Sequence, residues 1–180
     1  MCNGANLCYK KTAYFKVNGF EGNTKIASGD DLFLLQKMTV EFPTKICYLK
    51  SNEAIVTTNT ENSWKLFLNQ QIRWAAKTTA YESYFSKFIG LIVLAINLTL
   101  VALVIATLLD NFYWKYLFII YLLKLLFDFL LIYKTAVFLN NKNSLNYYIL
   151  ISVLYPFFII YIGILSLFKN YEWKGRLFKK

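Results

Sequence analysis

The sequence predicts an α/β segment followed by an α-helical membrane region. Its 180 residues are 57% hydrophobic and only 17% charged, which is more apolar than an ordinary soluble domain. The apolar residues are concentrated after Lys87, where two runs of 22 residues carry no charge. Before Lys87, charges, turn residues and short apolar stretches alternate as they do in water-soluble α/β proteins. The two parts therefore have to be interpreted separately.

The part before Lys87 carries signals for short elements. Strands are expected where aromatic or β-branched residues lie between turn signals, at Leu7–Tyr9, Lys45–Leu49 and Ala54–Thr58. Helices are expected at Lys11–Lys16, before Asn18-Gly19, and at Asp30–Val40, before Pro43. Ser63 is a candidate N-cap for a longer helix that reaches about Lys87. So small a part buries little apolar area, so we expect it to belong to a larger domain.

Two uncharged runs predict transmembrane helices. Phe88–Leu109 would be about 33 Å long as a helix, which matches a hydrocarbon core of about 30 Å. Tyr147–Phe168 has the same length and contains Pro156, which a membrane helix tolerates where its neighbours satisfy the freed carbonyl. We expect both runs to cross the membrane.

The middle run, Tyr116–Tyr133, is ambiguous because it contains Lys124 and Asp128. Each charge costs about 2.5 to 3.5 kcal/mol at the centre of a membrane helix, but the i, i+4 spacing allows the two to pair. One interpretation is an intramembrane site or pore contact, as in a transporter. The other is an ion pair that faces neighbouring helices, or a helix that lies at the membrane surface.

The charges after the last run bear on topology. If all three runs cross, the basic tail lies on the opposite side from the first part, against the positive-inside tendency. Our hypothesis is that Tyr116–Tyr133 lies along the interface or re-enters, leaving two crossings and a cytosolic tail. The basic residues of the tail are Lys169, Lys174, Arg176, Lys179 and Lys180.

Composition also limits the compartment and the partners. The net charge of +10 is spread over both parts and flanks apolar spans, where anionic lipids of the cytoplasmic leaflet attract it. No nucleic-acid-binding motif is present, so no nucleic-acid partner is expected. Three cysteines without CxxC spacing, and no histidine, argue against a disulfide framework, most zinc sites and a histidine base. We expect an integral protein of the inner or plasma membrane with its soluble part in the cytoplasm.

Two short motifs contain candidate catalytic or binding residues. In Ser28-Gly29-Asp30-Asp31-Leu32, adjacent carboxylates stand where a loop enters a helix. An acidic residue at a helix N-terminus is commonly only a cap, although a carboxylate there can also deprotonate a hydroxyl.

The second motif, Gln70-x-x-Arg73-Trp74, lies on the helix before the membrane. An arginine can fork onto a diphosphate, and an indole can stack on a sugar ring. The same residues would also suit a juxtamembrane helix with an aromatic anchor and a snorkelling base.

The order of the motifs resembles the C-terminal half of a membrane-embedded family 2 glycosyltransferase. That family includes cellulose, chitin and hyaluronan synthases and ceramide glucosyltransferases. The matching motifs, before the apolar spans and at the tail, are Gly4-Ala5-Asn6, Tyr14-Phe15-Lys16-Val17-Asn18-Gly19-Phe20, Gly29-Asp30-Asp31, Gln70-x-x-Arg73-Trp74 and Glu172-Trp173-Lys174-Gly175-Arg176. Gln-x-x-Arg-Trp (QxxRW) is the one motif that is specific by itself.

The resemblance implies a GT-A fold and four regions. Residues 1–62 would be the C-terminal part of a GT-A domain, and residues 63–87 an amphipathic interfacial helix with the QxxRW motif. Residues 88–168 would be the transmembrane region, with runs at 88–109, 116–133 and 147–168. Residues 169–180 would be a basic tail.

The resemblance also implies roles for single residues. Asp31, with Asp30 as the alternative, would be the general base that deprotonates the acceptor hydroxyl. Arg73, with Gln70, would bind the donor diphosphate, and Trp74 would stack on the acceptor. Gly4, Ala5 and Asn6 would line the acceptor side of the pocket. The reaction would invert the anomeric centre in a single displacement, and Asp31 and Trp74 would share one cleft above the bilayer.

The family uses a divalent metal, Mg or Mn, held by an Asp-x-Asp motif in the nucleotide-binding half, and this sequence contains no such motif. We therefore expect a fragment that contributes no metal ligand and is inactive alone. The implied partners are a nucleotide-sugar donor, a lipid-linked or growing glycan acceptor, and membrane lipids. The alternative is a small, non-catalytic integral membrane protein whose cytosolic cap binds a partner.

Overall fold

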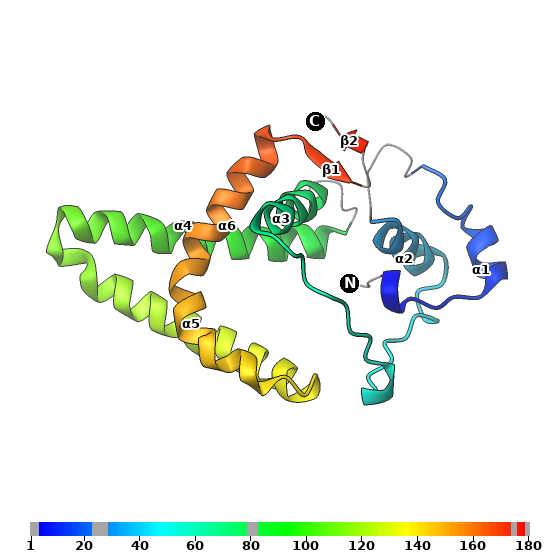
Figure 1. The fold of residues 1–180 in the computed structure, drawn as a ribbon, viewed down its shortest axis with the longest axis horizontal. Helices are drawn as coiled ribbons and strands as arrows, with labels where there is room; N and C mark the ends of the chain where they lie inside the picture. The colour runs from blue at the N-terminus through cyan, green and yellow to red at the C-terminus, as the bar shows by residue number, and fades with distance from the viewer. Residues whose placement is uncertain (1–3, 23–28, 79–82, 174–175, 179–180) are drawn as a thin grey trace. The chain divides into compact units, whose positions relative to one another are not determined.

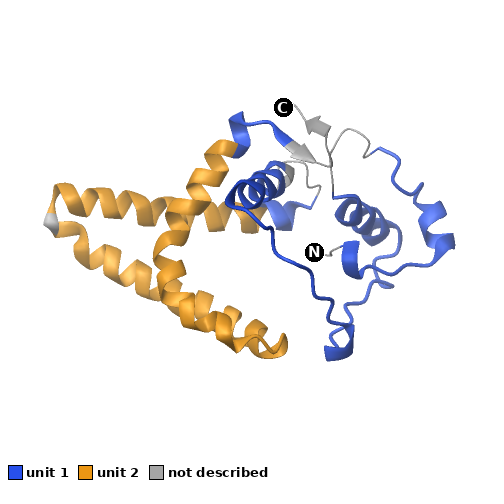
Figure 2. Cartoon of the chain, in the orientation of Figure 1, with its two compact units in different colours: residues 1–87, 166–180 blue, residues 88–165 orange. Residues whose placement is uncertain are grey.

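The computed structural model of the chain describes residues 4–22, 29–78, 83–173 and 176–178. They form two compact units, residues 1–87 with 166–180, and residues 88–165 (Figure 2). The helices and strands are α1 (Lys11–Lys16), α2 (Asp30–Glu41), α3 (Trp64–Thr78), α4 (Tyr84–Leu109), α5 (Trp114–Phe138), α6 (Tyr148–Phe168), β1 (Tyr171–Trp173) and β2 (Arg176–Phe178) (Figure 1). Short 3-10 helices are Gly4–Asn6, Asn52–Ala54, Asn111–Tyr113 and Lys142–Tyr147.

The described part of residues 1–87 is helical, so the expected α/β segment is wrong. It contains α1, α2, α3 and 3-10 turns but no strand. Leu7–Tyr9 and Lys45–Leu49 are irregular, and the segment expected to be a strand at Ala54–Thr58 begins in a 3-10 turn and continues without regular structure. The partial GT-A domain expected for residues 1–62 is not seen.

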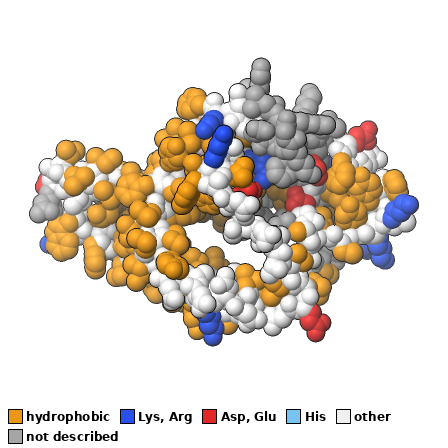
Figure 3. All heavy atoms as spheres, viewed as in Figure 1, with side chains coloured by type: hydrophobic (Ala, Val, Ile, Leu, Met, Phe, Trp, Pro, Cys, Tyr) orange, Lys and Arg blue, Asp and Glu red, His pale blue; other side chains and the backbone are white. Residues whose placement is uncertain are grey.

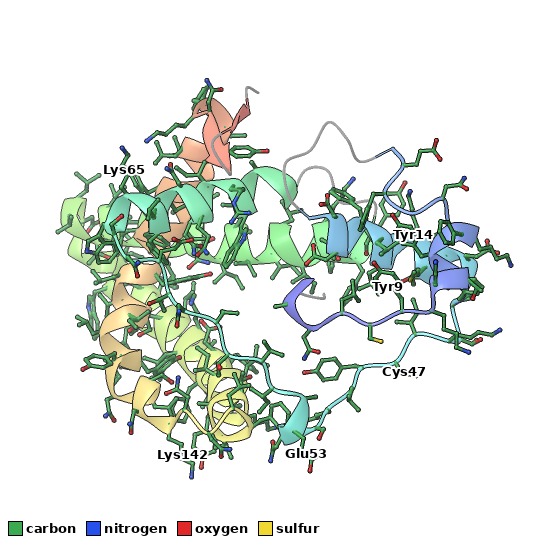
Figure 4. The ribbon with its side chains drawn as sticks, turned by 45° about the vertical axis from the view of Figure 1, so that its right-hand side comes forward. Tyr9, Tyr14, Cys47, Glu53, Lys65 and Lys142 are labelled. Atoms are coloured by element: carbon green, nitrogen blue, oxygen red, sulfur yellow. The ribbon has the colours of Figure 1, made fainter. Side chains whose placement is uncertain are left out.

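The strand predictions failed because short extended segments need a partner ladder. A run of three to five residues gains little as a strand unless a neighbouring strand satisfies its backbone groups. In Leu7–Tyr9, the aromatic ring packs on a nearby helix instead: Tyr9 stacks on Tyr14 of α1, with ring centroids 5.7 Å apart (Figure 4). The strands that do form among the described residues pair with each other. In this antiparallel β1–β2 hairpin, Tyr171 lies opposite Phe178.

The helices of the first unit follow the local signals more closely. α1 has the predicted bounds, and α2 ends one residue beyond them. α3 begins directly after Ser63, whose Oγ accepts a hydrogen bond from the Leu66 backbone N–H (3.3 Å), so the predicted N-cap is confirmed. The predicted continuous helix to Lys87 is wrong: α3 spans Trp64–Thr78, Ser83 is not helical, and a separate helix, α4, begins at Tyr84. The part of the prediction at 79–82 lies outside the described residues.

A tight turn joins α1 to the segment before α2. Gly19 has φ +47°, a backbone conformation that a side chain disfavours, and its carbonyl accepts a hydrogen bond from Lys37 Nζ of α2 (3.0 Å). The carbonyl of Glu21 accepts a second one (2.5 Å). The ring of Tyr14 lies against that of Phe20, with centroids 5.3 Å apart. These contacts fix the predicted Tyr14–Phe20 motif against α2.

The other unit consists of the apolar helices. Among the residues that the structure describes, three segments are long and apolar enough to cross a membrane: Tyr84–Leu109, Trp114–Phe138 and Lys142–Phe168. They include both predicted transmembrane runs and the ambiguous middle run. Hydrophobic side chains make up much of the visible surface of these helices in Figure 3. Length and composition therefore make membrane insertion possible for all three.

Polar contacts join α5 to α6 inside this unit. The hydroxyls of Tyr121 and Ser152 are 2.8 Å apart, and Tyr148 Oη donates to the Leu125 carbonyl (2.6 Å). Lys124 forms an ion pair with Asp128, and its ammonium lies 5.3 Å from the centroid of the Tyr155 ring. The interpretation of Lys124 and Asp128 as an ion pair that faces a neighbouring helix is confirmed.

Candidate functional site

Asp31 lies in the first turn of α2 and is held by backbone hydrogen bonds. Its Oδ2 accepts from the Gly4 N–H (2.7 Å), and its Oδ1 accepts from the Leu32 N–H (2.9 Å). Gly4 is 27 residues earlier in the chain, so this contact joins two of the sequence motifs. The structure therefore brings the predicted base and the predicted acceptor-side segment together.

The Gly4–Asn6 turn is anchored at its other end as well. Asn6 Nδ2 donates to the Ala54 carbonyl (2.6 Å), which ties the turn to the Asn52–Ala54 3-10 helix. Ala5 and Asn6 are exposed, and so is Asp30, the alternative base. The turn is thus fixed by both ends while its surface stays open to solvent.

Gln70 and Arg73 occupy one side of α3, as their i, i+3 spacing predicts. Gln70 Nε2 donates to Glu61 Oε1 (3.1 Å), and Glu61 also interacts electrostatically with Arg73. Glu61 lies just before the helix and was not among the residues that the sequence singled out. Trp74, the next residue of the motif, leaves 48% of its surface exposed.

Arg73 is enclosed almost completely, with 7% of its surface exposed, and its neighbour Ile72 is fully buried. The element that packs on α3 here is β1 of the C-terminal hairpin. Tyr171 of β1 is itself buried, at 9% exposure, and interacts electrostatically with Arg73. A residue of the tail therefore helps to form the surroundings of the QxxRW arginine.

Burial and the neighbouring groups act on both titratable side chains. Burial lowers the pKa of the Arg73 guanidinium, while Glu61 and Tyr171 counteract that change. Burial raises the pKa of the Tyr171 phenol, and Arg73 opposes the rise. An arginine stays protonated over the physiological range even so, which makes Arg73 a permanent cation in a largely dry setting.

Sequence reasoning missed Glu61 and Tyr171. For Glu61 the available signal was its position just before an N-capped helix, nine residues from Gln70. For Tyr171 the signal was weaker: an aromatic residue directly before the tail motif Glu172-Trp173-Lys174-Gly175-Arg176. Nothing in the local pattern pairs that tyrosine with a helix about 100 residues earlier in the chain.

The described residues do not fit the divalent metal that the resemblance implies. Among them no group of three or more histidine, cysteine, aspartate or glutamate side chains could hold an ion. The Asp31 carboxylate is directed at backbone N–H groups, which are donors and not metal ligands. No chemical step is therefore assigned to a metal through these residues.

The comparisons with known proteins show the family to which the chain belongs. The family description "Glycosyl transferase family 21" matches residues 1–180, the whole length of the sequence. No curated protein and no solved structure matches the chain. The match confirms the resemblance to a glycosyltransferase of the family 2 type, which includes the ceramide glucosyltransferases. The chain belongs to glycosyl transferase family 21.

Proposed function

We propose that this chain forms the acceptor side and the membrane part of an inverting glycosyltransferase. The enzyme transfers a sugar from a nucleotide-sugar donor to a lipid-linked or growing glycan acceptor at the cytosolic membrane face. The family match over residues 1–180 is the observation that carries the proposal. The Gly4–Asp31 contact and the enclosed Arg73 support it, because they fix the two side chains to which the chemistry is assigned.

The proposed reaction is a single displacement. The acceptor hydroxyl oxygen attacks the anomeric carbon and forms the new glycosidic bond, while the bond from that carbon to the diphosphate breaks. The hydroxyl proton passes to the Asp31 carboxylate, and the nucleoside diphosphate leaves with the electron pair. Arg73 stabilises the negative charge that grows on the diphosphate, and Trp74 stacks on the acceptor.

This reaction makes one demand on the geometry: Asp31 and Trp74 have to reach the same acceptor. The half-exposed indole is suited to stacking, because one of its faces can meet a ligand. The exposed Gly4–Asn6 turn next to Asp31 gives the acceptor a surface on which to lie.

The assignment of the base is tested with Asp31→Asn in the enzyme expressed from its complete gene. An asparagine keeps an oxygen that can accept from the Gly4 N–H but cannot take the proton. We expect sugar transfer to fall by about 100- to 10,000-fold, measured as incorporation of radiolabelled sugar from a panel of nucleotide sugars into lipid and glycan fractions of membranes.

Asp30→Asn is the matched control, because Asp30 is the exposed neighbour in the same helical turn. We expect it to retain most of the transfer. Loss of activity in Asp30→Asn with retention in Asp31→Asn would move the base to position 30. Undiminished transfer in both variants would remove the general-base role from this pair.

A further inference from the structure

The surroundings of Arg73, the arginine of the QxxRW motif, include a residue from the C-terminal hairpin. Arg73 and Tyr171 are both buried, and the strand that carries Tyr171 packs on the helix that carries Arg73. β1 is held in turn by β2, through the antiparallel pairing that sets Trp173 opposite Arg176. The hairpin thus presents Tyr171 to α3 from a paired strand and not from a loose tail.

An arginine needs such support if it is to act on a diphosphate. Its side chain has several rotatable bonds and carries about 2 kcal/mol of rotamer entropy. Catalysis by a charge depends on that charge being in place before the reaction, since reorganisation reduces the stabilisation of the transition state. Burial of Arg73 where β1 packs on α3 restricts the positions that its guanidinium can sample.

The other side of the motif is fixed independently. Gln70 donates to Glu61, and Glu61 interacts electrostatically with Arg73. Arg73 therefore interacts both with a carboxylate from the segment before α3 and with an aromatic residue of β1, and two such neighbours restrict the guanidinium more than one would.

We propose that Tyr171, delivered by the C-terminal hairpin, is a positioning residue that holds the Arg73 guanidinium in place for sugar transfer. The inference rests on the proposed function, because it assigns Arg73 to the diphosphate. The aromatic ring does the positioning by packing. Phenylalanine should therefore replace Tyr171 and alanine should not.

The first test measures the position of Arg73 without any reference to activity. Arg73 and Arg176 are the only arginines in the sequence, so modification by phenylglyoxal can be assigned to each by mass spectrometry. We expect Arg73 to react slowly in the wild type and in Tyr171→Phe, and at least about fivefold faster in Tyr171→Ala, because loss of the ring exposes it. The control is Tyr48→Ala, which removes an exposed ring (79%) from the same unit and should leave the rate unchanged.

The second test measures transfer by the same variants in the enzyme expressed from its complete gene. A guanidinium that is no longer held fails mainly in the transition state. We therefore expect kcat to fall about 10- to 100-fold in Tyr171→Ala, with a much smaller change in the donor KM. Tyr171→Phe should stay within about threefold of the wild type, and Tyr48→Ala should be indistinguishable from it.

The two tests separate failure of the inference from failure of the proposed function. Unchanged Arg73 reactivity in Tyr171→Ala would overturn the inference whatever the kinetics. Increased reactivity with unchanged kcat would also overturn it, because the contact would then be structural only. If the wild type transfers no sugar from any donor, the proposed function fails, while the reactivity still reports whether Tyr171 encloses Arg73.

Discussion

Arg73 and Tyr171 show what enclosure does to single ionisable side chains. A cation at 7% exposure is stable only where other groups compensate for the water it has lost, and here a carboxylate and a phenol lie within its electrostatic range. The raised pKa of the Tyr171 phenol means that the fold favours its neutral form. Deprotonation of the Tyr171 phenol should therefore lower the stability of the folded protein.

The pH dependence of stability provides a prediction for Tyr171. Because the folded-state pKa lies above the unfolded value of about 10, the stabilisation is fully present below pH 10 and is lost as the pH rises through the folded value. We expect the wild type in detergent to lose more thermal stability above pH 10 than Tyr171→Phe, which has no proton to release. Parallel curves for the two proteins would contradict this.

Site residues that stand in a recognisable sequence motif could be predicted from the sequence. Site residues outside such motifs were missed. Asp31 and Gly4 belong to motifs that predicted site residues, and the Gly4 N–H donates a 2.7 Å hydrogen bond to Asp31 Oδ2. Tyr171 could not be found in this way. Its neighbour in space is Arg73, and only the fold of the whole chain brings the two together.

Among the elements, the turn after α1 depends on its glycine. A Cβ on Gly19 would lie 2.4 Å from Tyr14 Cζ and 2.5 Å from its Oη, and φ at this residue is positive. The Tyr14 ring is held by contacts with the rings of Tyr9 and Phe20, so it cannot move away without disturbing them. The turn therefore has two separate reasons to require glycine.

Substitution of Gly19 by alanine should destabilise this part of the chain by about 2 to 4 kcal/mol, as the sum of left-handed strain and overpacking. Gly22→Ala is the matched control: its φ is also positive (+87°), but a Cβ there meets nothing within 4 Å. We expect a loss of only about 1 kcal/mol from it. The stability of both variants is measured as their susceptibility to limited proteolysis in increasing urea. Equal destabilisation by the two substitutions would show that contact with Tyr14 adds nothing to the requirement for glycine.

Within α5, the ion pair between Lys124 and Asp128 provides another prediction. Removing one partner leaves a charge in an apolar setting, whereas removing both does not. Lys124→Met should lower the thermal stability of the detergent-solubilised protein clearly, and Lys124→Met with Asp128→Leu should restore most of it. Loss of sugar transfer in a stable double variant would show that the pair has a functional role.

The predicted helices and strands differ in how strongly their formation depends on residues far away in the sequence. Transmembrane runs, α1, α2 and the Ser63 cap are encoded within one or two turns of sequence, and their positions agree with the pattern to within a few residues. Strand predictions at Leu7–Tyr9 and Lys45–Leu49 needed partners that the pattern could not supply, and both segments remain irregular.

For the whole molecule, the packing of β1 on α3 restricts the membrane topology. Segments in contact lie on one side of a bilayer, so an even number of crossings has to separate α3 from β1. Three segments of the described chain between them are long and apolar enough to cross. We therefore predict that at least one of the three does not cross completely, as the hypothesis of two crossings requires.

Cysteine accessibility tests this topology. In a variant with Cys2, Cys8 and Cys47 replaced by serine, single cysteines are introduced as Asn59→Cys before α3 and Lys169→Cys before β1, both at exposed positions. We expect a membrane-impermeant maleimide to label both from the same side of sealed vesicles. Labelling from opposite sides would show that the hairpin does not pack on α3 in the membrane.

The docking of β1 on α3 also has a consequence for biosynthesis. Ribosomes add about 5 to 20 residues per second, so several seconds separate the emergence of Arg73 from that of Tyr171. Throughout that interval the nascent enzyme has its arginine without the residue proposed to position it. A polypeptide whose Tyr171 has not yet left the ribosome would thus be a poor catalyst.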